Sequence, residues 1–309
     1  MNTPAPTRVS GSGLAFATSA YVLWGFLPIL FVSIIGATAP EIVAWRIVLS
    51  LIFCALLVTV TRGWPRLIAI LRNRAAMFTL TAASVFILIN WVVFIYATQT
   101  DHVVEASLGY FTNPIVTVLL GVFFLKERLR PVQWVAIGIS AIAVLVLAIG
   151  YGTFPWISLA LAFSFGFYGL VKRRVGPSVD AIGGMTVETA VLTPAAIIAL
   201  VIIGQTSGLA MGNHGAGQTV LMLSLGVATA TPLILFAAAA RRLPLVYLGL
   251  VQYLAPILML LVGVFLLHEQ MPIERWIGFG IVWVALALLT FDMVRHESRQ
   301  RQLIVSGAP

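Results

Sequence analysis

Residues 105–138 read EASLGYFTNPIVTVLLGVFFLKERLRPVQWVAIG, and residues 247–280 read YLGLVQYLAPILMLLVGVFLLHEQMPIERWIGFG. The second stretch repeats the first at an offset of 142 positions, and from Pro114 to Gly138 ten of twenty-five positions are identical. The identical positions include a proline, a glutamate, a tryptophan and two glycines, which a common apolar composition does not by itself bring into register. The sequence therefore predicts a tandem duplication, with one repeat in residues 1–150 and the second in residues 151–309.

The composition is that of a membrane protein. Of the 309 residues, 61% are hydrophobic and only 9% are charged, whereas soluble domains carry about 25% charged residues. The single cysteine, Cys54, lies inside an apolar run, so neither a disulfide framework nor a cysteine-based metal site is expected. A polytopic membrane protein is the class that fits these figures.

Ten apolar runs are long enough, at about 17 to 25 residues, to cross a hydrocarbon core about 30 Å thick. Backbone polar groups in lipid must be satisfied within each segment, so runs of this length are expected to be helices. The expected spans are 14–35, 41–61, 75–97, 103–125, 131–149, 154–171, 181–204, 218–239, 243–267 and 275–293. The predicted fold class is all-α: a polytopic membrane protein of ten transmembrane helices, built as two five-helix repeats. Between the second and third spans, residues 64–72 form either an amphipathic helix lying flat at the interface or a solvated loop.

The basic residues indicate the orientation of the chain. With a cytoplasmic N-terminus, the cytoplasmic segments hold 16 of the 18 Lys and Arg residues, and only Arg46 and Arg275 lie elsewhere. This distribution obeys the positive-inside rule, so both termini are predicted to be cytoplasmic and the net charge of +8 needs no nucleic-acid partner. Matched linkers also exchange their charge: residues 62–74 hold four Arg, whereas residues 204–218 hold no Lys, Arg or acid. Such an exchange indicates two repeats of inverted topology, the plan of many secondary transporters.

Charged side chains within the spans are candidate functional residues, because burying a charge in hydrocarbon is costly. Glu188, the most central acid, is a candidate proton-coupling or cation-binding group. Arg46 is a candidate either to hold a substrate carboxylate or to pair with Glu188, although the two lie at different depths. The alternative for both is a structural ion pair. Glu105, near Asp101 and His102 at the predicted outer edge, fits a solvated rim better than a proton relay.

Amide and aromatic side chains are expected to line a substrate cavity where the two repeats meet. Several flank Pro114 and Pro256, each of which frees a backbone carbonyl within its helix. The candidates are Asn90, Trp91, Tyr110 and Asn113 in the first repeat, Thr229, Thr231, Gln252 and Tyr253 in the second, and Trp24 and Tyr168 on the first span of each repeat. The alternative for each of them is a purely structural contact between helices.

Motifs for other chemistries are missing from the sequence. There is no GxxxxGK[ST] phosphate-binding loop for an ATP-driven pump, no HExxH and no GxSxG. We therefore expect no catalytic residues, no metal and no cofactor.

At these residues the chain resembles the EamA-type transporters of the drug/metabolite transporter superfamily, and within it the RarD subgroup. The resemblance runs from the first span to the last. It is carried by NW at 90–91, EASLGYFTNP at 105–114, LALAFSFGFYGLVK at 159–172, ET at 188–189 and TPLILFAAAARRL at 231–243. The resemblance implies a permease of the bacterial cytoplasmic (inner) membrane with ten spans in two inverted five-helix repeats. Because the superfamily handles amino acids, other metabolites and drugs, it leaves the substrate open.

The sequence favours a secondary transporter that exports a small amphipathic metabolite or drug-like molecule by alternating access. Its expected partners are that small molecule, the lipid bilayer and a proton as the candidate coupling ion, while the oligomeric state is left open. The first alternative is a membrane-embedded enzyme or lipid-handling protein, which would need a nucleophile, a base or metal ligands at one membrane face. The second is a channel or a sensor, and a channel, unlike a carrier, would show flux without saturation.

Overall fold

The computed structural model of the protein describes residues 10–126, 129–151, 154–173, 175, 179–240, 242–243 and 245–306. The regular secondary structure of these residues is entirely helical. The helices are α1 (Gly11–Val32), α2 (Ala39–Val60), α3 (Trp64–Arg72), α4 (Arg74–Gln99), α5 (Val103–Leu125), α6 (Pro131–Tyr151), α7 (Trp156–Arg173), α8 (Ala181–Thr206), α9 (Gly215–Leu223), α10 (Leu225–Ala240), α11 (Leu245–Val251), α12 (Leu254–Leu261), the π-helix η1 (Val262–Leu266) and α13 (Ile273–Ser306).

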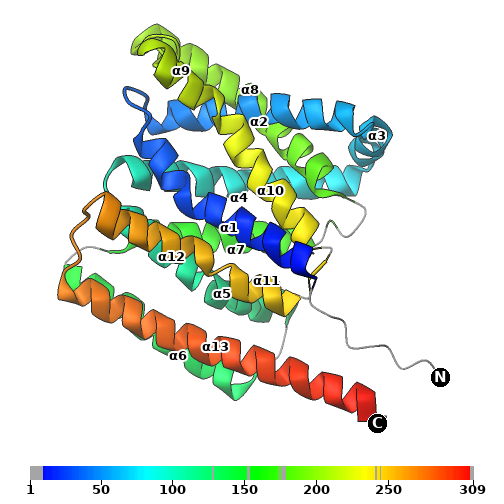
Figure 1. Ribbon diagram of the computed structural model, residues 1–309, viewed down its shortest axis with the longest axis vertical. Coiled ribbons are helices and arrows are strands. Elements are labelled where there is room, and N and C mark those ends of the chain that lie inside the picture. The colour runs from blue at the N-terminus through cyan, green and yellow to red at the C-terminus, as the bar shows by residue number, and fades with distance from the viewer. Residues whose placement is uncertain are drawn as a thin grey trace.

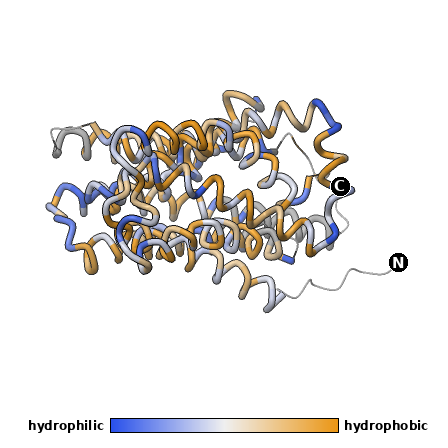
Figure 2. Tube along the Cα trace, turned by 90° about the horizontal axis from the view of Figure 1, so that it is seen from above, coloured by the Kyte–Doolittle hydropathy of each residue, from blue (hydrophilic) through white to orange (hydrophobic). Residues whose placement is uncertain are grey.

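Seven helical segments in the described part of the chain are long and apolar enough to cross a membrane. They are Gly11–Val32, Ala39–Val60, Arg74–Gln99, Val103–Phe124, Ala181–Thr206, Gly215–Phe236 and Ile273–Asp292, and shorter apolar helices cover Pro131–Val146, Trp156–Lys172 and Leu254–Leu266. Figure 2 shows that the tube is mostly hydrophobic along the helices, with hydrophilic stretches gathered near their ends. The all-helical, membrane-protein character predicted from the sequence is confirmed.

Two of the predicted spans are divided in the structure. The run 218–239 is shared between α9 and α10, which meet at Ser224, and the run 243–267 is broken at Gln252 and Tyr253 between α11 and α12. Pro256 weakens the helix at the second break, because proline has no N–H to donate to the carbonyl four residues earlier, which here belongs to Gln252. Residues 64–72, for which the sequence left a loop as an alternative, form the helix α3.

Side chains at the helix starts account for several of the boundaries. Ser10 Oγ, Asn73 Oδ1 and Asp180 Oδ1 each accept a hydrogen bond from the backbone N–H three residues later, at 3.2, 3.1 and 2.9 Å. These bonds satisfy donors that have no partner within the first turn of α1, α4 and α8. Equivalent helices also begin 142 positions apart: α2 and α8, α5 and α11, and α6 and α13.

The helices pack in pairs that join the two halves of the sequence (Figure 1). Helix α2 packs against α8, and α6 packs against α13 along one edge of the bundle. Helix α1 lies against α10 and α12, while α7 lies against α4 and α5. The largest cluster of buried apolar side chains is formed mainly by α1, α2, α4, α7 and α8, and it surrounds the buried polar residues described next.

Candidate functional site

Arg46 joins four helices at the centre of the candidate site. It is the eighth residue of α2 and only 4% of its surface is exposed. Its Nε donates a hydrogen bond of 2.9 Å to Thr229 Oγ1 on α10. Its guanidinium carbon lies 4.4 Å from the ring centre of Trp91 on α4 and 5.5 Å from that of Phe31 on α1, which are cation–π distances. Its Nη1 is buried and has no hydrogen-bond partner among the described residues.

A polar network lies next to this guanidinium on α4. Asn90, the neighbour of Trp91, accepts a hydrogen bond of 3.0 Å from the Tyr110 hydroxyl on α5. The Asn90 amide nitrogen donates to Ser164 Oγ at 3.1 Å and to the Leu161 carbonyl oxygen at 3.2 Å, both on α7. Asn90, Trp91 and Tyr110, predicted as members of one cavity, are thus brought together around Arg46.

Glu188 belongs to a second polar cluster, on α7 and α8. It is the eighth residue of α8, is 4% exposed and forms an ion pair with Lys172. Its carboxylate also accepts a hydrogen bond of 3.2 Å from the Tyr168 hydroxyl, whose oxygen accepts one of 3.0 Å from Lys172 Nζ. The Lys172 side chain is 30% exposed and that of Glu188 only 5%, so the ion pair joins a buried carboxylate to a more exposed ammonium group.

A line of aromatic rings connects the two clusters. Phe31, Phe94, Tyr110, Phe165 and Tyr168 follow one another with centroid separations of 5.8, 5.6, 6.1 and 5.9 Å. Such separations are usual for interacting ring pairs. The structure therefore links the Arg46 cluster to the Glu188 cluster through packed rings rather than through an ion pair.

The structure separates some of the predicted residues from these clusters. Trp24 contacts Tyr21 and Phe236 between α1 and α10, at ring-centre distances of 5.2 and 5.8 Å. Gln252 lies half-buried at the break between α11 and α12, and its neighbour Tyr253 packs on a different apolar cluster, formed by α5, α6, α12 and α13. Trp24 does pack on the large apolar cluster around Arg46, but the hydrogen bonds, ion pairs and ring contacts found among the described residues join none of these three side chains directly to Arg46 or Glu188.

Two further candidates lie on α5 with unpaired oxygens. Glu105 is half-buried in the first turn, and its Oε1 has no hydrogen-bond partner among the described residues. Asn113 lies further along the helix, and its buried Oδ1 is likewise unpaired within the described part of the chain. Asp101 is exposed, as expected for a rim residue.

Sequence reasoning missed Lys172 and Ser164. Lys172 was assigned to a cytoplasmic loop, but α7 continues to Arg173 and places it one turn beyond Tyr168, facing Glu188. The available signal was the spacing of Tyr168 and Lys172, because residues four apart lie on one face of a helix. Ser164, four residues before Tyr168, follows the same spacing.

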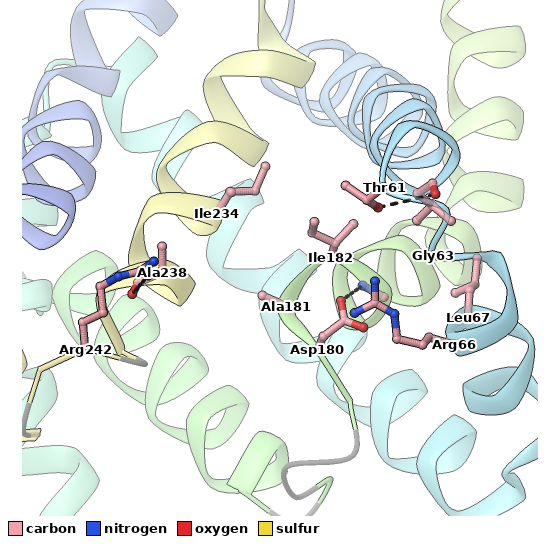
Figure 3. A pocket seen from close by; sticks show the side chains of 12 residues that line it. Thr61, Gly63, Arg66, Leu67, Asp180, Ala181, Ile182, Ile234, Ala238 and Arg242 are labelled. Atoms are coloured by element: carbon pink, nitrogen blue, oxygen red, sulfur yellow. Dashed lines mark hydrogen bonds between the residues drawn. The ribbon is translucent and has the colours of Figure 1, made fainter. Parts of the chain in front are cut away.

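A pocket of about 300 Å³ opens at the end of the bundle where α2 and α10 finish and α8 begins (Figure 3). It is lined by Val58, Thr61, Gly63, Arg66, Leu67, Asp180, Ala181, Ile182, Gly183, Ile234, Ala238 and Arg242. The two arginines come from α3 and from the residues that follow α10, and the one acid precedes α8. The α2–α10 seam that carries Arg46 and Thr229 therefore ends in a basic pocket.

Side chains close the opposite end of the bundle. Glu41 is only 1% exposed, and its Oε1 accepts a hydrogen bond of 2.8 Å from the backbone N–H of Ala210. Gln218 bonds to two backbone groups of the turn after α1, accepting the Ile35 N–H at 3.0 Å and donating to the Ser33 carbonyl at 2.9 Å. These contacts, here called the end seal, join residues 33–41 to residues 210–218.

The comparison with known families fits this architecture. The sequence profile of the EamA-like transporter family matches residues 11–149 and, a second time, residues 155–291. The chain belongs to the EamA-like transporter family. This confirms the predicted resemblance and makes the protein a multi-pass membrane transporter.

Relatives of this EamA-like transporter cover almost its whole length. It is 44% identical over 299 residues to Protein RarD of Streptomyces exfoliatus, an alignment that covers 96% of this chain and 94% of that protein. It is 39% identical over 289 residues to the uncharacterized transporter YojE of Bacillus subtilis (strain 168), covering 92% and 95%. A solved crystal structure of another protein matches at a TM-score of 0.58 and 19% identity, over 92% of this chain and 99% of that one, which supports the fold alone.

Proposed function

We propose that this protein is a secondary transporter that exports a small amphipathic metabolite or drug-like molecule by alternating access. The bacterial cytoplasmic membrane is the proposed location. In this proposal the Arg46 cluster binds the substrate at the interface of the two repeats, and Glu188 couples transport to an ion.

The equivalence of Arg46 and Glu188 carries the proposal. Both are the eighth residue of their helices, α2 and α8, and they lie 142 positions apart in the two segments that match the family. The two helices pack against each other, with the start of α2 next to the chain that follows α8. Transporters built from inverted repeats bind the substrate and the coupling ion at the interface of the repeats, so these two charged residues are the proposed sites.

The packing of the helices supports two inverted repeats, residues 1–150 and residues 151–309, with ten crossings in all. Under the 142-residue offset, the packing of α1 on α10 and α12 has its counterpart in the packing of α7 on α4 and α5. Five crossings per repeat would give the repeats opposite orientations and leave both termini in the cytoplasm. The broken helix α11–α12 also has the form of the discontinuous helices of transporters.

The two ends of the bundle suggest an inward-open state. With cytoplasmic termini, the basic pocket would face the cytoplasm and the end seal would face the outside. Alternating access requires these ends to open and close in turn, and the end seal consists of a few hydrogen bonds that can be broken.

Glu188 is the proposed coupling residue because it is buried and because its partner can move. Lys172 is one-third exposed on a flexible stem, so it can withdraw toward water and leave Glu188 to take up a proton. A proton is therefore the proposed coupling ion.

Counterflow in proteoliposomes tests the proposal. Vesicles loaded with mixtures of amino acids, nucleosides or antibiotics are diluted into a trace of one labelled solute from the same class. We expect one class to show saturable accumulation that Arg46→Ala and Glu188→Gln each reduce at least tenfold. Accumulation at the wild-type rate in both variants would refute the site, and flux without saturation or counterflow would indicate a channel.

A further inference from the structure

Among the residues that the structure describes, the buried acidic side chains accept hydrogen bonds or form an ion pair, whereas the one buried arginine keeps a donor without a partner. Within the described residues, the buried charged side chains are Glu41, Arg46, Glu188 and Glu269. Glu188 faces a lysine, and Glu41 accepts backbone N–H groups at the end seal. Glu269 accepts the N–H groups of the first two residues of α5, at 2.6 and 2.9 Å, where the helix dipole favours a negative charge. Each carboxylate thus has a donor or a cation directly opposite it.

Arg46 differs from these carboxylates because one of its buried donors, Nη1, has no hydrogen-bond partner among the described residues. The ion pairs found among the described residues do not include it, and its hydrogen-bond partner, Thr229, is neutral. The rings of Trp91 and Phe31 attract the guanidinium but cancel none of its charge. A guanidinium cannot escape this cost by losing its proton, so a fixed positive charge with a free Nη1 donor remains inside the bundle.

We propose that this charge selects the substrate class: Arg46 binds the carboxylate of a small organic monoanion. This inference rests on the proposed function and deepens it. A guanidinium presents planar donors that match a carboxylate, and its one uncompensated charge balances one negative charge. A substrate amine would instead add a second positive charge at a buried site, and a neutral solute would leave the first charge uncompensated.

The basic pocket supports the same substrate class. Its charged lining residues are Arg66, Arg242 and a single acid, Asp180; Arg66 lies beside Asp180, whose Oδ1 already accepts the Gly183 N–H at 2.9 Å, while Arg242 lies across the pocket (Figure 3). The pocket thus has an excess of positive charge, which raises the local concentration of an anion. It is lined by α2 and α10, the helices that carry Arg46 and Thr229, so both positive sites lie along one seam.

Thermal stability of the purified full-length protein in detergent tests the inference with matched probes. One set is benzoate, benzamide and benzylamine, and the other is indole-3-acetate, indole-3-acetamide and tryptamine. In at least one set we expect the carboxylate to raise the apparent Tm while the amide and the amine leave it unchanged. An equal rise with the amide or the amine, or no rise with either carboxylate, would overturn the inference.

Variants separate anion binding from a structural role for the arginine. We expect Arg46→Gln to raise the apparent Tm without ligand, because it removes an uncompensated charge, and to abolish the rise that the carboxylate causes. Arg46→Lys should restore part of that rise, and Arg72→Gln, at an exposed position of α3, should behave as the wild type. If Arg46 had only a structural role, Arg46→Gln would instead lower the apparent Tm without ligand, which would refute the inference. The inference would also be refuted if the carboxylate raised the Tm of Arg46→Gln as much as that of the wild type.

Counterflow distinguishes failure of the inference from failure of the proposed function. Saturable counterflow of amides or amines without carboxylate binding would refute the substrate class and leave the transporter proposal standing. Carboxylate binding that depends on Arg46, combined with no counterflow of any solute, would refute the transporter proposal instead.

Discussion

At the scale of single residues, Glu188 and Lys172 differ in how far their side chains are exposed. This difference predicts how the stability of each variant changes. Lys172→Met leaves a carboxylate unpaired in a site where its side chain is 5% exposed, which we expect to cost about 1–3 kcal/mol. Glu188→Gln leaves a lysine that is 30% exposed and can reach water, so it should cost less than about 1 kcal/mol. The apparent Tm in detergent should therefore fall further for Lys172→Met than for Glu188→Gln.

The double variant Lys172→Met/Glu188→Gln is the control for this prediction. It removes both charges, so we expect it to recover most of the Tm lost in Lys172→Met while counterflow stays at the level of Glu188→Gln. Recovery of transport together with stability would mean that the pair only holds α7 against α8.

The residues proposed for the site could be selected from the sequence where they are intrinsically costly to bury. Arg46 and Glu188 stood out because charges are rare in apolar helices, and Asn90, Trp91 and Tyr110 because amide and aromatic groups suit a cavity. Lys172 could not be recognised in the same way, because a lysine at the end of a span reads equally well as a loop residue. Which acid pairs with which base depends on how helices distant in sequence pack, and the sequence contains no direct measure of that packing.

At the scale of helices, the offset of 142 residues holds for the starts of α2 and α8, α5 and α11, and α6 and α13, but neither the offset nor hydropathy predicts where a helix breaks. Hydropathy marked 243–267 as one span, because every part of it is apolar, but the backbone breaks at Gln252 where Pro256 withholds a donor. Pro114 at the matched position does not break α5, which continues from Val103 to Leu125. A proline at this position therefore does not by itself determine whether the helix breaks.

The end seal gives a second prediction, at the level of the helix ends it joins. Gln218→Ala removes two hydrogen bonds between residues 33–35 and α9, which together contribute about 1–2 kcal/mol to the closed end. We expect the open form to become roughly 5–30 times more populated. The measurement is the rate at which a membrane-impermeant maleimide labels Ala37→Cys, a buried position at the seal, in a Cys54→Ala background.

Asn213→Ala is the matched control for the seal. The Asn213 amide bonds to the Leu209 carbonyl within its own loop, at 2.6 Å, and does not join the two halves. Labelling should be unchanged in this variant. If both substitutions increased the labelling rate equally, any loosening of this loop would expose position 37. The hydrogen bonds of the end seal would then have no specific role in the transport cycle.

At the scale of the whole molecule, an inverted repeat predicts that equivalent positions lie on opposite sides of the membrane. Leu71 on α3 and Asn213 before α9 are 142 positions apart and both are exposed. In the proposed topology five crossings separate them, and the four Arg of residues 62–74 favour the cytoplasm for the first, whereas residues 204–218 carry no Lys, Arg or acid. In intact cells carrying Cys54→Ala, an impermeant maleimide should label Asn213→Cys and leave Leu71→Cys unlabelled, and both should react once the membrane is broken. Labelling of both positions from the same side would require an even number of crossings between them, and two repeats of opposite orientation could not then be built from this chain.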